Sequence, residues 1–337
     1  MKKYTFWGRI AAFAIGGIMI FSGFAMAAEQ ALNAYTIWSE RYANAVFSAF
    51  TEDTGIKVNW MRFSSGEVQA RLEAEKGNPQ VDVVFGNMAE AFVSGTPKGL
   101  FEPYVPQGAE PIPAKFKDPD GYWTGVAIDP ICFMFNTKFL KDHGLEAPAS
   151  WEDLTNPAYK NQLQMADART SGTAMYRILS LIQAMGEDKA YEYQKKLNVN
   201  VQVYTKSGAG GALPIGRGQA AGGIFFLVDA LEMQQKGYDV TISYPKDGVV
   251  AGIEAMALVK GAKQPELAKK FLDWASTERM QRIYEKSQIN LIPSNPEVQI
   301  SNPGLDMSKV NVLPLDIKWA GENRDRLVER WVDEVLK

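Results

Sequence analysis

The alternation of strand and helix patterns is the feature that most constrains the fold of this chain. Residues 32–37 alternate apolar and polar side chains as a strand does, and residues 40–51 carry apolar side chains at helical spacing. A second alternating stretch at 56–60 and a helical stretch at 65–76 follow, and 81–85 is a short apolar run typical of a buried strand. This β-α-β-α-β order predicts an α/β protein with a parallel sheet and helices on both faces.

The pattern stops at residues 94–124, which carry six prolines and several glycines, and then resumes. No flexible linker separates the two parts, so the chain is expected to build half of its structure, cross to a second lobe and return later. Strands near 125–130, broken at Asp129-Pro130, and at 249–259 are the predicted crossings. A single long amphipathic helix is expected at 266–286 and another at 324–336. The predicted lobes are residues 28–127 plus 254–300 for lobe one and 128–253 plus 301–337 for lobe two.

The first 27 residues have the layout of a signal peptide. Three cations among the first nine residues precede an apolar run, which ends in Ala25-Met26-Ala27, a cleavage site of small residues. The alternative is a single membrane anchor, but the apolar run at 10–24 is shorter than the ~20 residues that a spanning helix needs. We therefore expect an exported, periplasmic protein that begins at Ala28.

The composition excludes several classes of protein. The 36 Lys and Arg residues are balanced by 39 Asp and Glu residues, and this net charge of −3 argues against binding to nucleic acid. With one cysteine and one histidine, the chain cannot form an internal disulfide bond or a zinc site of Cys and His ligands. The core alone must stabilise the exported protein.

Three turns rich in Gly, Ser and Thr each follow a predicted strand, at residues 64–67, 169–173 and 206–211. Backbone N–H groups at the start of a helix are unpaired and carry partial positive charge, and glycine allows a ligand to approach closely. Each turn alone could be an ordinary helix cap. Their recurrence favours binding of an anionic group.

Catalysis is not expected, because the residues for it are missing or badly placed. No Gly-x-Ser-x-Gly elbow surrounds any serine, and the glycine-rich stretch at 211–216 lacks the Lys-Ser/Thr of a nucleotide-binding loop. His143, in Lys-Asp-His-Gly, has the context of a helix C-terminus. Cys132 lies in an apolar strand and is expected to be a buried small hydrophobe. A secreted hydrolase is therefore the weaker alternative.

The export signal and the segments 47–58, 80–84, 167–173 and 268–273, in this order and spacing, resemble periplasmic solute-binding proteins of ABC importers. The resemblance is to the branch that holds ferric-ion, phosphonate and sugar-phosphate binders. It implies the two-lobed type II fold, with the ligand cleft between lobes that close by a hinge. It also implies a monomer without a cofactor that carries a small anionic solute to a membrane permease and its ATPase.

The resemblance also indicates the kind of ligand. Ferric-ion members present two adjacent tyrosines, whereas the comparable stretch here, residues 222–227, carries Phe225 and Phe226. Ferric ion is therefore the alternative to a phosphonate or sugar phosphate, which the related members hold on hydroxyl- and glycine-rich turns. The candidate contacts carried over by position are Ser64, Ser65 and Gly66 from lobe one, and Ser171, Gly172, Thr173, Ser207 and Gly208 from lobe two.

Four further residues complete the predicted site. Trp38 and Ser39, at the end of the first strand, are expected at the mouth of the cleft. Asp229 and Glu254 could accept hydrogen bonds from ligand hydroxyl or amine groups. The alternatives for Trp38, Asp229 and Glu254 are core packing, a surface cap and an ordinary strand position.

Overall fold

The first half of the described chain is the predicted β-α-β-α-β unit. Apart from Met1, the computed structural model describes residues 31–337, so the signal peptide and its cleavage site lie outside the described residues. The unit consists of β1 (Ala31–Thr36), α1 (Glu40–Thr54), β2 (Lys57–Arg62), α2 (Ser65–Glu75) and β3 (Val83–Met88). β1 pairs in parallel with both β2 and β3, as the pattern predicts. Among residues 31–337 no helix combines the length and apolar character needed to cross a membrane.

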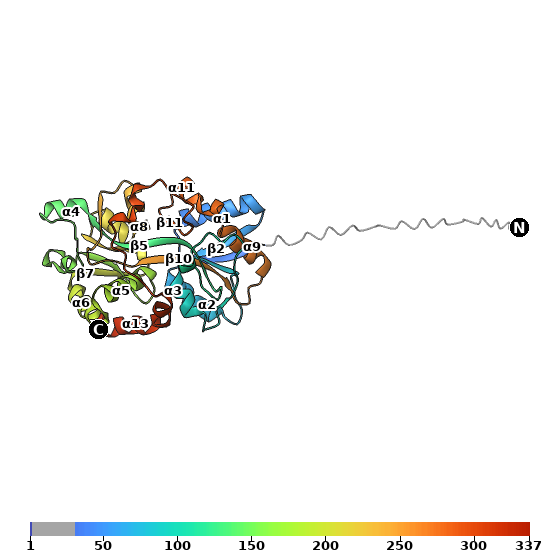
Figure 1. Ribbon diagram of the computed structural model, residues 1–337, viewed down its shortest axis with the longest axis horizontal. Coiled ribbons are helices and arrows are strands. Elements are labelled where there is room, and N and C mark those ends of the chain that lie inside the picture. The colour runs from blue at the N-terminus through green and yellow to red at the C-terminus, as the bar shows by residue number, and fades with distance from the viewer. Residues whose placement is uncertain (2–30) are drawn as a thin grey trace. The chain divides into compact units, whose positions relative to one another are not determined.

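Two long strands join the halves of the molecule. β10 (Ala251–Val259) lies between β3 and β5 (Thr124–Asn136) and is antiparallel to both. The first part of β5 pairs with β10, and its last part pairs with β8 (Gly222–Phe226). Figure 1 shows β5 and β10 running side by side between the two halves. The predicted break at Asp129-Pro130 is wrong, because Pro130 sits in register opposite Ala251.

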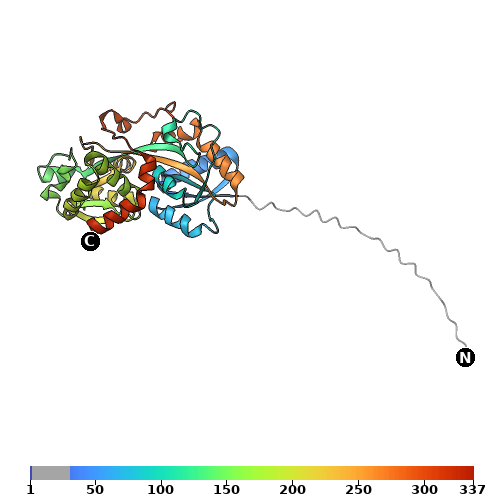
Figure 2. The ribbon, with the colours of Figure 1, turned by 60° about the horizontal axis from the view of Figure 1, so that its bottom comes forward.

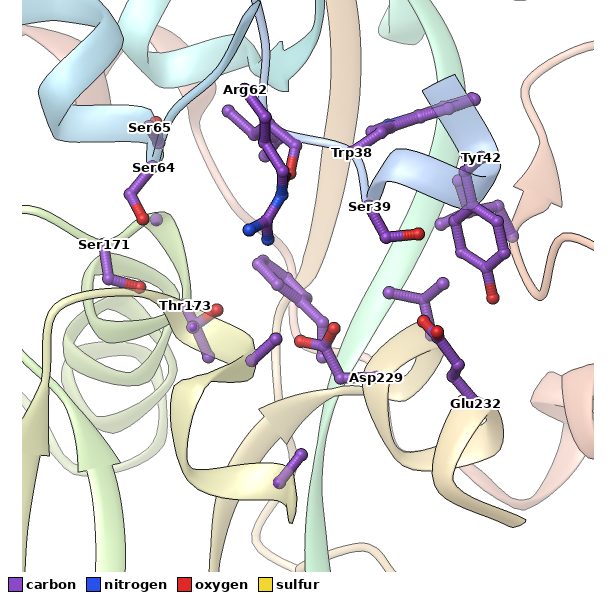
Figure 3. Close-up of a pocket in the computed structure, with 18 of the residues that line it drawn as sticks. Trp38, Ser39, Tyr42, Arg62, Ser64, Ser65, Ser171, Thr173, Asp229 and Glu232 are labelled. Carbon is purple, nitrogen blue, oxygen red and sulfur yellow. Dashed lines mark hydrogen bonds between the residues drawn. The ribbon is translucent and has the colours of Figure 1, made fainter. Parts of the chain in front are cut away.

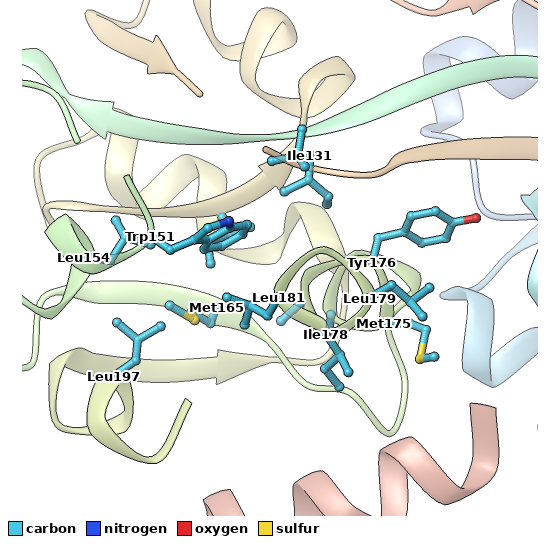
Figure 4. Packing of buried hydrophobic residues seen from close by; sticks show 14 of the residues in the cluster. Ile131, Trp151, Leu154, Met165, Met175, Tyr176, Ile178, Leu179, Leu181 and Leu197 are labelled. Carbon is cyan, nitrogen blue, oxygen red and sulfur yellow. The ribbon is translucent and has the colours of Figure 1, made fainter. Parts of the chain in front are cut away.

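The second half is built on β5, β6 (Leu163–Ala166), β7 (Val201–Thr205), β8 and β9 (Val240–Ser243). β6 pairs in parallel with β7 and β8, and β9 pairs with β5. Helices α5 (Gly172–Met185) and α6 (Glu187–Leu197) cover this sheet. Apolar side chains of α5 belong to the same buried core as Trp151 and Leu154 (Figure 4).

The C-terminal helices lie against both halves (Figure 2). α12 (Ile317–Glu322) packs on α3 (Ala89–Gly95), and α13 (Arg324–Trp331) contacts both α3 and α5. A Cβ atom at Gly321 would lie 2.5 Å from Val93 Cβ, so glycine allows this close packing. The remaining elements are β4 (Phe101–Glu102), α4 (Thr137–Asp142), α7 (Ala212–Gly216), α8 (Leu227–Gln235), α9 (Pro265–Ala275), α10 (Glu278–Gln281), α11 (Ile283–Lys286) and β11 (Ile292–Pro293).

The predicted α/β class and two-lobed arrangement are confirmed, whereas the exact lobe bounds stay a prediction. The single helix expected at 266–286 is wrong, since α9, α10 and α11 replace it. The hydroxyl of Ser276 donates back to Leu272 O at 3.0 Å, and Thr277 Oγ1 accepts from Met280 N–H at 3.4 Å to cap α10. These local bonds compete with helical ones and end α9. The second expected helix is α13 followed by a π-helical turn, Val332–Leu336.

Candidate functional site

A cavity of about 350 Å³ lies between the segments that the sequence analysis singled out. It is bordered by the β1–α1 and β2–α2 turns, the start of α5, the turn before α7, the first turns of α8, and β10. Its size is that of a pocket for a small molecule. The predicted site residues among its lining are Trp38, Ser39, Ser64, Ser65, Ser171, Gly172, Thr173, Gly208, Asp229 and Glu254.

Gly66 and Ser207 do not line the cavity, although their neighbours do. The N–H of Gly66 donates to Thr170 O at 2.9 Å, so it is already used by another turn of the protein. The carbonyl oxygen of Ser207 accepts from Thr205 Oγ1 at 2.8 Å and from Gly210 N–H at 3.0 Å. Both residues therefore hold the turns in shape rather than face the cavity.

One side of the cavity carries hydroxyl groups and the starts of α2 and α5 (Figure 3). The side chain of Ser171 makes no capping hydrogen bond to α5, so its hydroxyl is not used as an ordinary cap. Ser65 is 2 % exposed, and its Oγ has no hydrogen-bond partner among the described residues. A buried hydroxyl without a partner costs free energy unless a ligand or water satisfies it.

The turns of the two halves meet at this side of the cavity. A Cβ atom at Gly172 would lie 3.2 Å from the Cβ of Ser65, and a Cβ atom at Gly208 would lie 2.0 Å from Thr173 Oγ1. No side chain fits at Gly208 without displacing Thr173. The third predicted turn opens only a short helix, α7, so its contribution is the glycine that lets the chain approach Thr173.

Arg62 is a lining residue that the sequence analysis missed. It is the last residue of β2, and its Nε donates to Ile37 O at 3.3 Å. Figure 3 shows its guanidinium group pointing into the cavity, between Ser64 and Asp229. The sequence feature that could have identified Arg62 as a site residue is its place at the carboxyl end of a parallel strand, directly before the Ser64-Ser65 turn.

The opposite side of the cavity carries the carboxyl groups of Asp229, Glu232 and Glu254, and Lys236 there forms an ion pair with Glu232 at 2.7 Å. Glu254 is 3 % exposed, and its Oε2 accepts a hydrogen bond from the indole N–H of Trp38. Burial, together with the nearby carboxylate of Glu232, raises the pKa of Asp229 to about 7. Glu232 and Tyr42 also line this side and were not predicted (Figure 3). A site with a cationic, hydroxyl-rich side and a carboxyl-lined side suits a ligand whose two ends differ in charge and in hydrogen-bonding groups.

The indole of Trp38 is fixed from several sides. It packs edge-on against Phe85 and Tyr284, with ring centroids 4.8 Å and 5.7 Å away. Gly86, with a φ of +74°, lies beneath it, and a Cβ atom there would come within 2.4 Å of Trp38 Nε1. Trp38 therefore holds Glu254 in place rather than offering an open aromatic face.

His143 and Cys132, which were considered for catalysis, lie away from this cavity. His143 follows α4, stacks on Phe139 and hydrogen bonds through Nδ1 to Phe139 O at 2.9 Å, which confirms the capping role. Cys132 is buried in β5. Within residues 31–337, no group of three or more His, Cys, Asp or Glu side chains is placed to hold a metal ion. Phe226 lines the cavity, whereas Phe225 packs in the core beside Cys132.

Comparisons with known proteins agree with this architecture. The family described as bacterial extracellular solute-binding protein matches residues 78–317. An uncharacterized protein of Haemophilus influenzae is 33% identical over 295 residues, covering 85% of each chain. A putative 2-aminoethylphosphonate-binding periplasmic protein of Salmonella typhimurium is 29% identical over 250 residues, covering 72% of this chain and 71% of the relative.

A solved structure is also similar over nearly the whole chain. The periplasmic binding protein AfuA of Actinobacillus pleuropneumoniae, with exogenous fructose 6-phosphate bound, is 32% identical with a TM-score of 0.87. The similarity covers 91% of this chain and 98% of that one. The chain therefore belongs to the bacterial extracellular solute-binding proteins and has the two-lobed type II fold of the periplasmic members.

Proposed function

We propose that the protein is the receptor for a phosphorylated sugar, which it captures in the cleft outside the cytoplasm and delivers to an ABC permease. The observation that carries this proposal is the division of one cavity into two chemically different sides. Arg62, the hydroxyl groups of Ser64, Ser65, Ser171 and Thr173, and the starts of two helices form one side. The carboxyl groups of Asp229, Glu232 and Glu254 form the other.

The first side suits the phosphate. A phosphate brings about −1.5 to −2 charges and three strong acceptor oxygens. The hydroxyls of Ser171 and Thr173 and the N–H groups at the start of α5 can donate to these oxygens, and Arg62 adds the positive charge. Because Ser64 and Arg62 come from one half and Ser171 from the other, the phosphate can be held by both halves at once.

The second side suits sugar hydroxyls. Asp229, Glu232 and Glu254 line it, and carboxyl groups accept hydrogen bonds from hydroxyl groups. The cavity of about 350 Å³ has room for a hexose phosphate. The AfuA structure, which holds fructose 6-phosphate, supports the same ligand class for this chain at 32% identity.

Isothermal titration calorimetry of the purified protein tests the proposal. We expect fructose 6-phosphate to bind with a one-to-one ratio, and fructose and inorganic phosphate to bind at least about a hundredfold more weakly, since each lacks one end. Binding of 2-aminoethylphosphonate in preference to the sugar phosphate would show that the acidic side selects an ammonium group instead. Preference for ferric citrate would reject an organic phosphate as the ligand.

A further inference from the structure

Asp129 is a buried carboxyl group directly behind the cavity, in the middle of β5. It is 1 % exposed and does not belong to the cavity lining. Its Oδ1 accepts from the N–H of Val228 at 3.2 Å, while its Oδ2 has no hydrogen-bond partner among the described residues. A buried carboxylate oxygen without a hydrogen-bond donor costs free energy, and burial therefore favours the protonated form of this carboxyl group.

The strand register brings Asp129 to the face that Glu254 occupies. Asp129 lies opposite Gly252, and Glu254 lies opposite Ala127, in the antiparallel pair of β5 and β10. Residues opposite each other, and residues two apart on one strand, share a face, so the two acids are diagonal neighbours at about 7–8 Å between Cα atoms. Gly252 places no side chain between them.

The surroundings of this pair are acidic, and no cation is hydrogen bonded to either member within residues 31–337. Asp229 adds a third carboxyl group from α8, and its cationic neighbours, Arg62 and Lys236, face Asp229 rather than the pair. The remaining titratable groups that face the pair are Cys132 on β5, Tyr176 on α5, Tyr244 after β9 and Tyr284 on α11. Each of these is neutral at ordinary pH, and burial raises its pKa further.

We propose that Asp129 and Glu254 share a proton at the floor of the cavity, and that Asp129 is the positioning residue that makes ligand capture depend on pH. The part that concerns the ligand rests on the proposed function. Ionising both of two neighbouring buried carboxyl groups costs more free energy than ionising one, because the two negative charges repel each other. While the pair holds this proton, Asp129 and Glu254 are not both ionised. The ligand at the cavity face of Glu254 then meets at most one negative charge from the pair.

The direction of the pH effect follows from the charges. Burial raises the pKa of Asp129 well above its usual value, and burial with the nearby Asp229 raises the pKa of Glu254 to about 8. Above this pH the floor gains negative charge, which repels a phosphorylated ligand and weakens capture. An anionic ligand in turn favours the protonated pair, so binding takes up a fraction of a proton.

Calorimetry with fructose 6-phosphate between pH 6 and 9 tests this coupling. For the parent protein we expect the affinity to fall by up to about tenfold per pH unit above pH 8, the limit for release of one proton. Asp129→Asn keeps the acceptor for Val228 and leaves Glu254 as a single acid without a second carboxyl group behind it. Glu254 should then ionise at a lower pH, so the affinity should fall by less than about threefold over the same unit. Titration of the phosphate itself affects both proteins equally.

The control is Asp120→Asn, since Asp120 is exposed and should leave the pH profile of the parent unchanged. Parallel titrations in buffers of different ionisation enthalpy measure the proton uptake directly. We expect this uptake to be smaller in Asp129→Asn than in the parent. Identical pH profiles for parent and Asp129→Asn would overturn the proposal.

Thermal unfolding without ligand separates this inference from the proposed function. A carboxyl group whose pKa is raised by folding contributes stability below its unfolded pKa, near 4, and this contribution is lost as the pH rises towards its folded pKa. The melting temperature of Asp129→Asn should therefore rise relative to the parent between pH 5 and 9. Glu254→Gln, which keeps an acceptor for Trp38, should behave alike if Asp129→Asn does not fold.

The two tests have distinct outcomes. If fructose 6-phosphate fails to bind but the melting temperatures diverge as expected, the proton-sharing pair stands and the proposed ligand is wrong. If both substituted proteins melt with the pH dependence of the parent, the pair does not share a proton, whichever ligand binds.

Discussion

The backbone N–H of Gly66 donates a hydrogen bond to Thr170 O at 2.9 Å, and this bond joins the two halves of the protein at the edge of the cavity. The carbonyl oxygen of Arg169 lies so close that a Cβ atom at Gly66 would approach it to 2.8 Å. An ion pair between Lys206 and Glu67 joins the same two halves. The halves thus meet through backbone atoms and an ion pair beside the proposed phosphate site.

Gly66→Val should prevent this contact and weaken ligand binding. The added side chain meets backbone rather than a flexible side chain, so the turn before α5 must move away, and closure then loses contacts from one half. We expect the affinity for fructose 6-phosphate to fall at least about tenfold, with less ligand-induced compaction in small-angle X-ray scattering. Gly77→Val is the matched control, because no atom lies within 4 Å of a Cβ there. Equal compaction in both proteins would contradict the role of Gly66.

Ser171→Ala and Thr173→Ala should each weaken binding by roughly one to two decades while the melting temperature changes little. Hydrogen bonds to a charged oxygen are worth about 1.5–3 kcal/mol, and about 1.4 kcal/mol corresponds to a decade in affinity. Calorimetry on each protein measures the loss, with Ser301→Ala at an exposed position as the control. Parent-like affinity in both would mean that these hydroxyls do not contact the ligand.

Gly172→Val should abolish binding, because a side chain at the start of α5 would crowd the turn of the other half. A Cβ atom there would lie 3.0 Å from Met88 and 3.2 Å from Ser65, so a larger group must displace the hydroxyl-bearing turn of the other half. Calorimetry reads the loss, and circular dichroism checks that the protein is folded. A folded protein with unchanged affinity would reject this explanation.

Arg62→Met should lower the affinity by about one to two decades, since it removes charge-assisted hydrogen bonds to the phosphate. The loss should be larger for fructose 6-phosphate than for any uncharged ligand that binds. Arg217→Met tests the effect of removing an exposed arginine elsewhere. If the two substitutions have equal effects, the guanidinium of Arg62 does not bind the phosphate.

Ferric citrate should produce no visible charge-transfer band with the purified protein. Phe225 and Phe226 offer no phenolate, and burial raises the pKa of Tyr42, so this lining phenol resists ionisation. Absorption spectroscopy during a ferric titration makes the measurement. A coloured, stoichiometric complex that survives excess citrate would be incompatible with this expectation.

The parts of the fold that local patterns encode could be predicted from the sequence. α1 ends at Gly55, whose φ of +75° suits glycine, and α2 begins after Ser64, as expected. The helix at 266–286 could not be predicted correctly, because its apolar spacing continues past Ser276 and Thr277 while their hydroxyl bonds end the helix.

The site was predicted at the turns that precede helices and at Asp229 and Glu254, whereas Arg62, Tyr42 and Glu232 were missed. Ser171 and Thr173 belong to a visible motif, whereas Arg62 is one charge in an exposed strand, and only the fold turns it towards the cavity. Gly66 shows the opposite error, because its neighbour Ser65 faces the cavity while its own N–H is taken by Thr170. Asp129 was interpreted as part of a break before Pro130, since a buried acid in a continuous strand has no local signal.

The position of β10 between β3 and β5 determines the order in which the protein can fold. A chain synthesised as far as Asn136 already holds β3 and β5, but the strand that lies between them arrives only with Ala251–Val259. Bringing such distant segments together costs loop entropy and slows folding. The first half can therefore not complete its sheet during most of the chain's synthesis, and its final folding must wait until the last quarter of the chain is being made.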